Sequence, residues 1–293
     1  FLVHRKDAKL SPRYLCLSEA LRKHTLEVRE TGTVQQLMFE NRSARNSVYV
    51  QSGEIVKGGR QDRTIRYDNV VPPKSGDVPV ASFCVESGRW SRRGKESGKR
   101  FAAGGYLSTK KLRLAAKADD NAQNKVWSQV ALTQERLNRL LDAQVRDDRS
   151  PTSLQLTLES KELRKRVKKH TDALADAPKR WKHVVGFCFA VNGQIVGGDV
   201  YASRALFLKM WPKLLGAGAV EAIVEHDTKK KVEPAKLGAV QAFLIAAEAG
   251  QPGKKPAPNG LKTVVYESKE AVLFELRPPD RTLPAIHESY VSK

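Results

Sequence analysis

The sequence predicts an α+β fold with a largely antiparallel β-sheet or sandwich core and helices from the central and C-terminal segments. Three observations predict it. Residues 1–90 alternate short apolar segments with polar turns, the central segment carries apolar residues at helical spacing, and an Asn-Gly pair separates two apolar arms around Asn192. We expect one composite domain over residues 1–293, in which the later strands complete a sheet begun by the early ones.

That domain contains four segments of different character. We expect strands in 1–90, a mobile basic loop in 91–111, helices in 112–180, and a hairpin, helices and closing strands in 183–293. The early strands are expected at 1–3, 14–17, 26–30, 36–39, 47–50, 64–67 and 79–85, with a helical turn at 18–23 and a turn at 71–77.

Helical spacing is clearest from Asn124 to Val145, where Val126, Val130 and Leu137 recur four and seven residues apart on one face. Another helix is expected at 153–175. The hairpin pairs 184–191 with 194–201, because Asn192-Gly193 tolerates the positive φ angles of a type I′ turn. Helices at 204–215 and 234–249, a loop at 251–259, and strands at 263–266 and 271–276 complete the chain.

The net charge of +20 and the isoelectric point near 9.9 predict attraction to polyanions such as nucleic acid. The chain has 40% hydrophobic and 29% charged residues, an ordinary globular composition. No apolar segment approaches the ~20 residues of a membrane span, so we expect none. The sequence is compatible with the cytoplasm, or with export if a signal was removed before Phe1.

Cysteine and histidine spacing indicates neither a disulfide framework nor a metal site. Cys16, Cys84 and Cys188 are odd in number and far apart, which favours inert, partly buried thiols. The six histidines lack metal-ligand spacing, and no cofactor is indicated. His226 and Asp227 are candidates for a hydrogen-bonded pair, and His287 is a candidate to fold back onto the sheet.

The first polar stretch runs Gly-Glu-Ile-Val-Lys-Gly-Gly-Arg-Gln-Asp-Arg from Gly53 to Arg63. Glycine lets the backbone approach a ligand closely, and amides beside Arg60 or Arg63 suit a phosphate. The spacing matches neither a Walker loop nor a dinucleotide fingerprint. The structural alternative is a tight hairpin turn whose Gln61, Asp62 and Arg63 bond to one another.

The second polar stretch, Cys84-Val85-Glu86-Ser87-Gly88-Arg89-Trp90, follows a predicted strand. Cys84 and Glu86 lie two residues apart and therefore face the same side of that strand. Arg89 would keep Glu86 ionised, and Trp90 would stack on a base or sugar. A structural ion pair under a tryptophan lid is an equal alternative.

These stretches resemble the ARG and Rhodanese-Phosphatase-superfamily-associated Protein domain family. The Gly-Gly-x-Gln-Asp-Arg and Cys-Val-Glu-x-Gly-Arg-Trp segments are the most specific parts of the likeness. It continues through Val126-Trp127, the hairpin at Val191 to Gly193, and Trp211 to Leu215, and so covers most of the chain. The family is named for association with ADP-ribosylglycohydrolases and rhodanese-like phosphatases, which implies a role in handling NAD or ADP-ribose derivatives.

The leading functional prediction is a binding or hydrolytic domain for an ADP-ribose-like or NAD-like phosphorylated nucleotide. The catalytic candidates are Glu54, Asp62 and Glu86, which would hold ribose hydroxyls or activate water. The ligand-binding candidates are Gly58, Gly59, Gln61, Arg63, Arg89 and Trp90.

The alternative prediction is a non-enzymatic polyanion-binding protein or a structural partner in a larger complex. Aromatic residues among cations can grip single-stranded nucleic acid. The candidate contacts are Arg92, Arg93, Lys95, Lys99 and Arg100. The cations of 161–169 are expected to form a solvated helix face.

Overall fold

A computed structural model describes residues 1–8, 14–118, 121–226, 232–256, 261–280 and 282–293, with only the backbone of 254–256. The chain divides into two compact units. The first comprises Phe1–Ser11, Leu174–Pro212 and Glu225–Lys293, and the second comprises Pro12–Ala173 and Lys213–Val224. That both form one composite domain stays a prediction.

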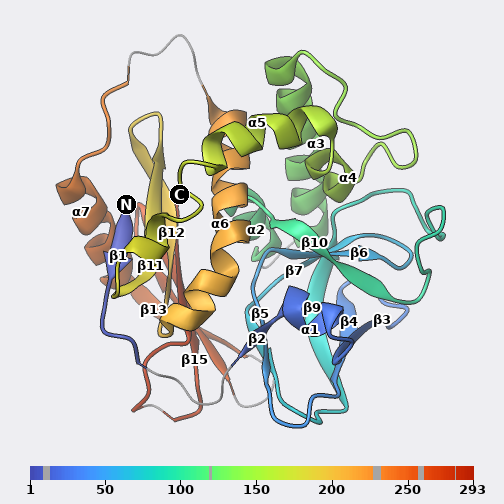
Figure 1. Cartoon of the computed structure of the whole chain (residues 1–293), viewed down its shortest axis with the longest axis horizontal. Coiled ribbons are helices and arrows are strands. Elements are labelled where there is room, and N and C mark those ends of the chain that lie inside the picture. The colour runs from blue at the N-terminus through green and yellow to red at the C-terminus, as the bar shows by residue number, and fades with distance from the viewer. Residues whose placement is uncertain (9–13, 119–120, 227–231, 257–260, 281) are drawn as a thin grey trace. The chain divides into compact units, whose positions relative to one another are not determined.

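The first unit is built on an antiparallel seven-stranded sheet in the order β1-β11-β12-β16-β15-β14-β13. Its strands are β1 (Leu2–His4), β11 (Val184–Val191), β12 (Gln194–Tyr201), β13 (Gln251–Pro256), β14 (Lys262–Glu267), β15 (Ala271–Arg277) and β16 (His287–Ser292). Figure 1 labels β1, β11, β12, β13 and β15 of this sheet. Of the described strands in residues 1–90, β1 alone joins it, so the sheet is completed by an early strand only at its edge.

The Asn-Gly hairpin prediction is confirmed. Asn192 and Gly193 have φ angles of 50° and 75°, and the arms they connect are β11 and β12. The loop expected at 251–259 is wrong for 251–256, which pair with β14 as the edge strand β13. An edge strand tolerates the Pro and Gly that suggested a loop.

His287 does fold back onto the sheet, in β16 between β12 and β15. Its Nε2 lies 3.2 Å from Asp199 Oδ1, and its ring stacks on Tyr201. β16 was not predicted as a strand, because its polar residues, His287 to Ser289, pair inside the sheet. Asp227, the expected partner of His226, lies outside the described residues.

Three helical elements belong to the first unit or enter it. They are η1 (Ala177–Arg180), α6 (Arg204–Glu225) and α7 (Leu237–Glu248). α6 continues beyond the expected end at 215 and contains Pro212. α7 packs on the sheet through Phe243, Leu244 and Ala247.

The second unit contains a six-stranded antiparallel sheet in the order β10-β6-β7-β9-β4-β3 and a three-stranded sheet in the order β2-β5-β8. The larger sheet consists of β3 (Leu26–Glu30), β4 (Gln36–Asn41), β6 (Glu54–Gly58), β7 (Arg63–Ile65), β9 (Asp77–Cys84) and β10 (Phe101–Leu107). The smaller consists of β2 (Leu15–Cys16), β5 (Val48–Val50) and β8 (Asn69–Val71). An isolated bridge between Arg29 and Arg100 joins the outer strands β3 and β10, which curls the larger sheet towards a barrel.

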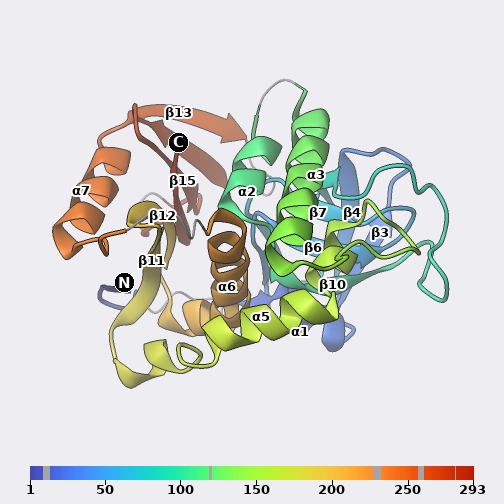
Figure 2. The ribbon, with the colours of Figure 1, turned by 90° about the horizontal axis from the view of Figure 1, so that it is seen from above.

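The helices of this unit are α1 (Leu17–Arg22), α2 (Lys110–Ala116), α3 (Ala122–Leu141), α4 (Leu154–Leu158) and α5 (Lys161–Thr171). α3 buries the predicted residues Val126, Val130 and Leu137 in one core with Phe83 and Val85. Figure 2 shows α3 beside α2. Within the described residues, no helix is both long and apolar enough to cross a bilayer.

Two predictions for this unit are wrong in part. The basic loop expected at 91–111 ends in a strand, β10, whose Phe101 and Leu107 are buried and which pairs with β6. Tertiary pairing therefore overrides a loop-like composition. The helix expected at 153–175 is two helices, α4 and α5. Ser160, the N-cap of α5, has a ψ angle of 144°, which is not helical and therefore separates the two.

Candidate functional site

The two polar stretches meet in space. β7 pairs with β9 so that Arg63 lies opposite Cys84, which brings the turn before β7 against the chain that follows β9. The backbone N–H of Asp62 donates to Glu86 Oε2 at 2.9 Å. Asp62 and Glu86, two of the three carboxylates that the sequence singled out, are therefore direct neighbours.

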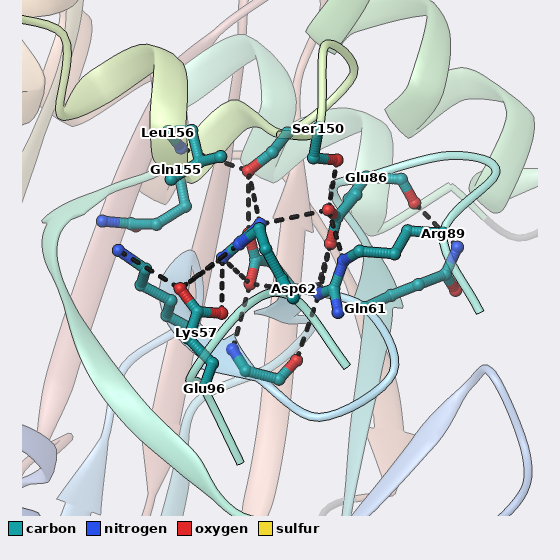
Figure 3. A network of polar contacts seen from close by, with 12 residues as sticks. Lys57, Gln61, Asp62, Glu86, Arg89, Glu96, Ser150, Gln155 and Leu156 are labelled. Carbon is teal, nitrogen blue, oxygen red and sulfur yellow. Dashed lines mark hydrogen bonds and ion pairs between the residues drawn. The ribbon is translucent and has the colours of Figure 1, made fainter. Parts of the chain in front are cut away.

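Figure 3 shows Asp62 and Glu86 within one network of polar contacts. Arg93 joins these carboxylates. Its Nη1 donates to Asp62 Oδ2 at 2.9 Å, and its Nη2 donates to Asp62 Oδ1 at 3.0 Å. Nη1 also lies 3.1 Å from Glu86 Oε1. Glu96 bonds the other side of the guanidinium, through Nε at 3.2 Å. The expected polyanion contact Arg93 is thus buried and turned inward.

Arg89 completes the pairing of Glu86 with two bonds of 2.6 Å from Nε and Nη2. Three further donors come from Gly58 and from two serines before α4: the Gly58 N–H donates to Asp62 Oδ1 at 3.0 Å, Ser153 Oγ donates to Asp62 Oδ2 at 2.8 Å, and Ser150 Oγ donates to Glu86. We call Asp62, Glu86, Arg89, Arg93, Ser150 and Ser153 the carboxylate network. All four carboxylate oxygens accept hydrogen bonds from the protein.

Burial and bonding move the two carboxyl groups in opposite directions. Burial, aided by the charge of Glu86, raises the pKa of Asp62 despite the opposing bond from Arg93. Burial also acts upward on Glu86, but bonds from Arg89 and Ser150 outweigh it and hold the pKa of Glu86 below its ordinary value. Paired carboxyls with divergent pKa values are typical of acid–base sites, yet a closed ion-pair network produces the same pattern.

Gln61, Arg63 and Cys84 form a second buried group beside the network. Cys84 Sγ lies 2.9 Å from Gln61 Oε1, and Arg63 Nη1 donates to the Gln61 carbonyl at 3.1 Å. Arg63 also pairs with Glu30 at 3.3 Å. Burial raises the pKa of Cys84 to about 11, so the thiol is protonated at neutral pH and unsuited to nucleophilic attack.

Gly58 and Gly59 lack side chains, and this allows the chain that leads into β10 to pack closely against them. A Cβ on Gly59 would lie 2.3 Å from Phe101 Cζ, and one on Gly58 would lie 2.8 Å from the carbonyl oxygen of Arg100. Gly59 also has a φ of +55°. These glycines therefore position Arg100 and Phe101.

The remaining candidates lie apart from the network. Glu54, at the other end of β6, is buried against Lys213 Nζ at 2.6 Å and accepts from the N–H of Gln51 at 3.0 Å. Trp90 is 57% exposed. Its neighbours Arg92 and Lys95 are exposed as well.

A groove of about 520 Å³ lies between α1, β3 and β10. Leu26, Val28 and Phe101 line it with apolar surface. Its charged and imidazole side chains are Arg22, His24, Glu27, Arg42 and Arg100.

One carboxylate joins two of the groove's cations. Glu27 accepts from Arg42 Nη2 at 2.6 Å and from Arg100 Nε at 3.1 Å. Of the groove's residues, only Arg100 was predicted from the sequence to bind a partner, as a polyanion contact. Arg22 and Arg42 stand in separate segments without a shared pattern, so no sequence signal connects them.

Comparison with known families gives one match. The model for the ARG and Rhodanese-Phosphatase-superfamily-associated Protein domain matches residues 1–290. Neither a curated protein nor a solved structure is similar enough to this chain to match.

Proposed function

Because this chain belongs to the ARG and Rhodanese-Phosphatase-superfamily-associated Protein domain family, we propose that it binds an ADP-ribose-like phosphorylated nucleotide. The proposed site is the groove between α1, β3 and β10. The observation that carries the proposal is the pairing of a cationic mouth with an apolar floor in one concave site. The family's association with ARG proteins supports the ligand class.

The phosphates of the ligand would meet the guanidinium groups of Arg42 and Arg100. A guanidinium offers a planar fork of donors that matches phosphate oxygens. Glu27 tethers both groups at the mouth, which reduces the rotamer freedom lost on binding. Arg22 adds a third positive charge, so the groove stays cationic although Glu27 is present.

The base or ribose would lie against the apolar floor. Leu26, Val28 and Phe101 are held in the hydrophobic core beneath the groove, so the floor is rigid rather than made of long mobile side chains. The volume of about 520 Å³ falls within the ~300–1,000 Å³ of ligand sites. A nucleotide-sized molecule therefore fits the groove better than a bare phosphate, which would leave the floor exposed.

The carboxylate network acts in this proposal as the support of the site. Arg93 anchors the loop that leads to Arg100, while Gly58 and Gly59 let Arg100 and Phe101 approach β6. Asp62 and Glu86 are thus positioning residues, since their oxygens already bond protein donors. Binding without hydrolysis at this network is the expectation that follows.

The test is titration calorimetry with ADP-ribose on the wild type, Arg100→Gln and Lys99→Gln. Lys99 is exposed beside Arg100 but does not line the groove, so both variants lose one charge from adjacent positions. Arg100→Gln removes charge-assisted hydrogen bonds of about 1.5–3 kcal/mol and should weaken binding at least tenfold. Lys99→Gln should change it less than about twofold.

If both variants lose affinity for ADP-ribose equally, net charge alone explains the loss, and the groove is not the binding site. The absence of any heat with ADP-ribose would refute the ligand class. A product formed from ADP-ribose during the titration, detected by chromatography, would contradict binding without hydrolysis. If both variants have the melting temperature of the wild type, neither change acts through folding.

A further inference from the structure

Helix α5 carries a row of lysines on the side away from its buried face. Lys161, Lys165 and Lys169 are spaced four residues apart and are all exposed. Leu163 and Val167 are the buried residues of the helix and hold it to the core. Because residues four apart lie above one another on a helix, the three ammonium groups form a line about 12 Å long.

More cations widen this row. Arg164 and Lys168 are exposed on the neighbouring positions of α5, and Lys168 is paired with Asp172 at 2.6 Å. The only acidic residue within α5 is Glu162. The helix therefore presents a strongly positive face to solvent.

The loop that follows β9 approaches the start of this helix. Lys57 Nζ bonds Glu159, just before α5, at 2.5 Å, and it lies 3.7 Å from Glu96 of the loop. While Arg93 and Glu96 face inward, Arg92 and Lys95 are exposed. We call Arg92, Lys95, Lys161, Arg164, Lys165, Lys168 and Lys169 the cationic surface.

We propose that the cationic surface binds nucleic acid. A linear row of cations complements a phosphate backbone, whose binding is dominated by such contacts. Trp90, 57% exposed directly before this loop, can stack on an unpaired base, which favours single strands. This partner is a polymer, and its surface is separate from the groove proposed for the small ligand.

An anionic membrane fits this surface less well than nucleic acid does. A helix that lies in a lipid interface buries an apolar face beside its cations. The apolar residues of α5, Leu163 and Val167, are instead buried in the protein core. What α5 offers to a partner is charge without an apolar stripe.

The experiment measures the affinity of a fluorescein-labelled, 20-nucleotide single-stranded DNA by anisotropy across a salt series. The test variant is Lys161→Gln/Lys165→Gln/Lys169→Gln, in which Gln keeps the helix propensity of Lys. The matched control is Lys182→Gln/Lys262→Gln/Lys269→Gln, which removes three exposed lysines of the first unit. Circular dichroism and melting temperature establish that both variants fold.

We expect the test variant to bind roughly ten- to a hundredfold more weakly at 0.1 M salt, because each lost phosphate contact removes about 0.7 from the slope of log affinity against log salt. The control should stay within about twofold of the wild type. Equal weakening of both variants would overturn the proposal, since net charge alone would explain it. No binding of the DNA, or tighter capture of phosphatidylserine vesicles through the same lysines, would overturn it as well.

Discussion

Arg93 grips Asp62 with both terminal nitrogens, at 2.9 and 3.0 Å, although 31 positions separate the two residues. This one contact anchors a loop of mostly polar and basic residues to the turn that leads into β7. It also divides the loop's cations into two groups, because Arg93 faces the carboxylate network whereas Arg92 faces solvent. The proposed groove and the cationic surface both depend on this difference.

Arg93→Gln should destabilise the protein by about 3–5 kcal/mol. The change leaves the buried carboxylates of Asp62 and Glu86 with only Arg89 as a cationic partner, and breaking a buried pair exposes the cost of the remaining charge. Urea denaturation measures the difference. Arg92→Gln, an exposed neighbour, should shift stability by no more than ~0.5 kcal/mol. Similar midpoints for the two variants would contradict a structural role of the network.

The loss of stability towards unfolding at acidic pH should depend on Glu86. Its folded pKa lies below the ordinary value of 4.5, so its contribution is complete above that pH and is lost as the pH falls through the folded pKa. Asp62 has the opposite sign: its raised pKa favours the folded state below the ordinary value of 3.8, and the benefit fades as the pH rises.

Denaturation midpoints between roughly pH 6 and pH 3 check this expectation. The wild type should lose more stability on acidification than Glu86→Gln, which has no proton to take up at this position. Glu162→Gln, on the exposed face of α5, serves as the control and should follow the wild type. Parallel curves for all three proteins would show that Glu86 does not determine the loss of stability at acidic pH.

Gly59→Ala should be more damaging than Gly32→Ala. Both glycines have positive φ angles, +55° and +83°, so both substitutions carry the strain of a left-handed residue. Only at Gly59 would the new Cβ also strike a side chain, at 2.3 Å from Phe101 Cζ, whereas nothing lies within 4 Å at Gly32.

We expect an additional loss of about 1–3 kcal/mol for Gly59→Ala, measured by urea denaturation. Adding Phe101→Leu to Gly59→Ala should recover part of it, because the shorter side chain relieves the contact. If the two glycine variants are equally stable, the close approach of Phe101 does not constrain this turn.

Cys84 should resist alkylation in the folded protein. Burial raises the pKa of its thiol to about 11, so very little thiolate exists near pH 8 and the sulfur is also shielded. Iodoacetamide labelling followed by peptide mass spectrometry should find Cys84 unmodified in buffer and modified in urea. Rapid labelling of native Cys84 would reverse our assignment of the thiol as inert.

Elements with a strong local period were predicted well. The alternating residues of β3, the apolar stripe of α3 and the Asn192-Gly193 hairpin follow from side-chain periodicity and from φ preferences, which act within a few residues. β10 and β13 were not predicted as strands. Their Gly, Pro and basic residues suggest loops, and only the neighbouring strands β6 and β14 supply the hydrogen bonds that make them strands.

The same division applies to the site. The sequence by itself determined the positive charge of the chain, the membership of its family and which polar residues are concentrated between Gly53 and Trp90. Only the tertiary structure decided that Asp62 and Glu86 face inward to Arg89 and Arg93, and that Arg42 and Arg100 meet across a groove. The physical reason is that composition and periodicity report local preferences, whereas burial and ion pairing depend on which distant strands pair.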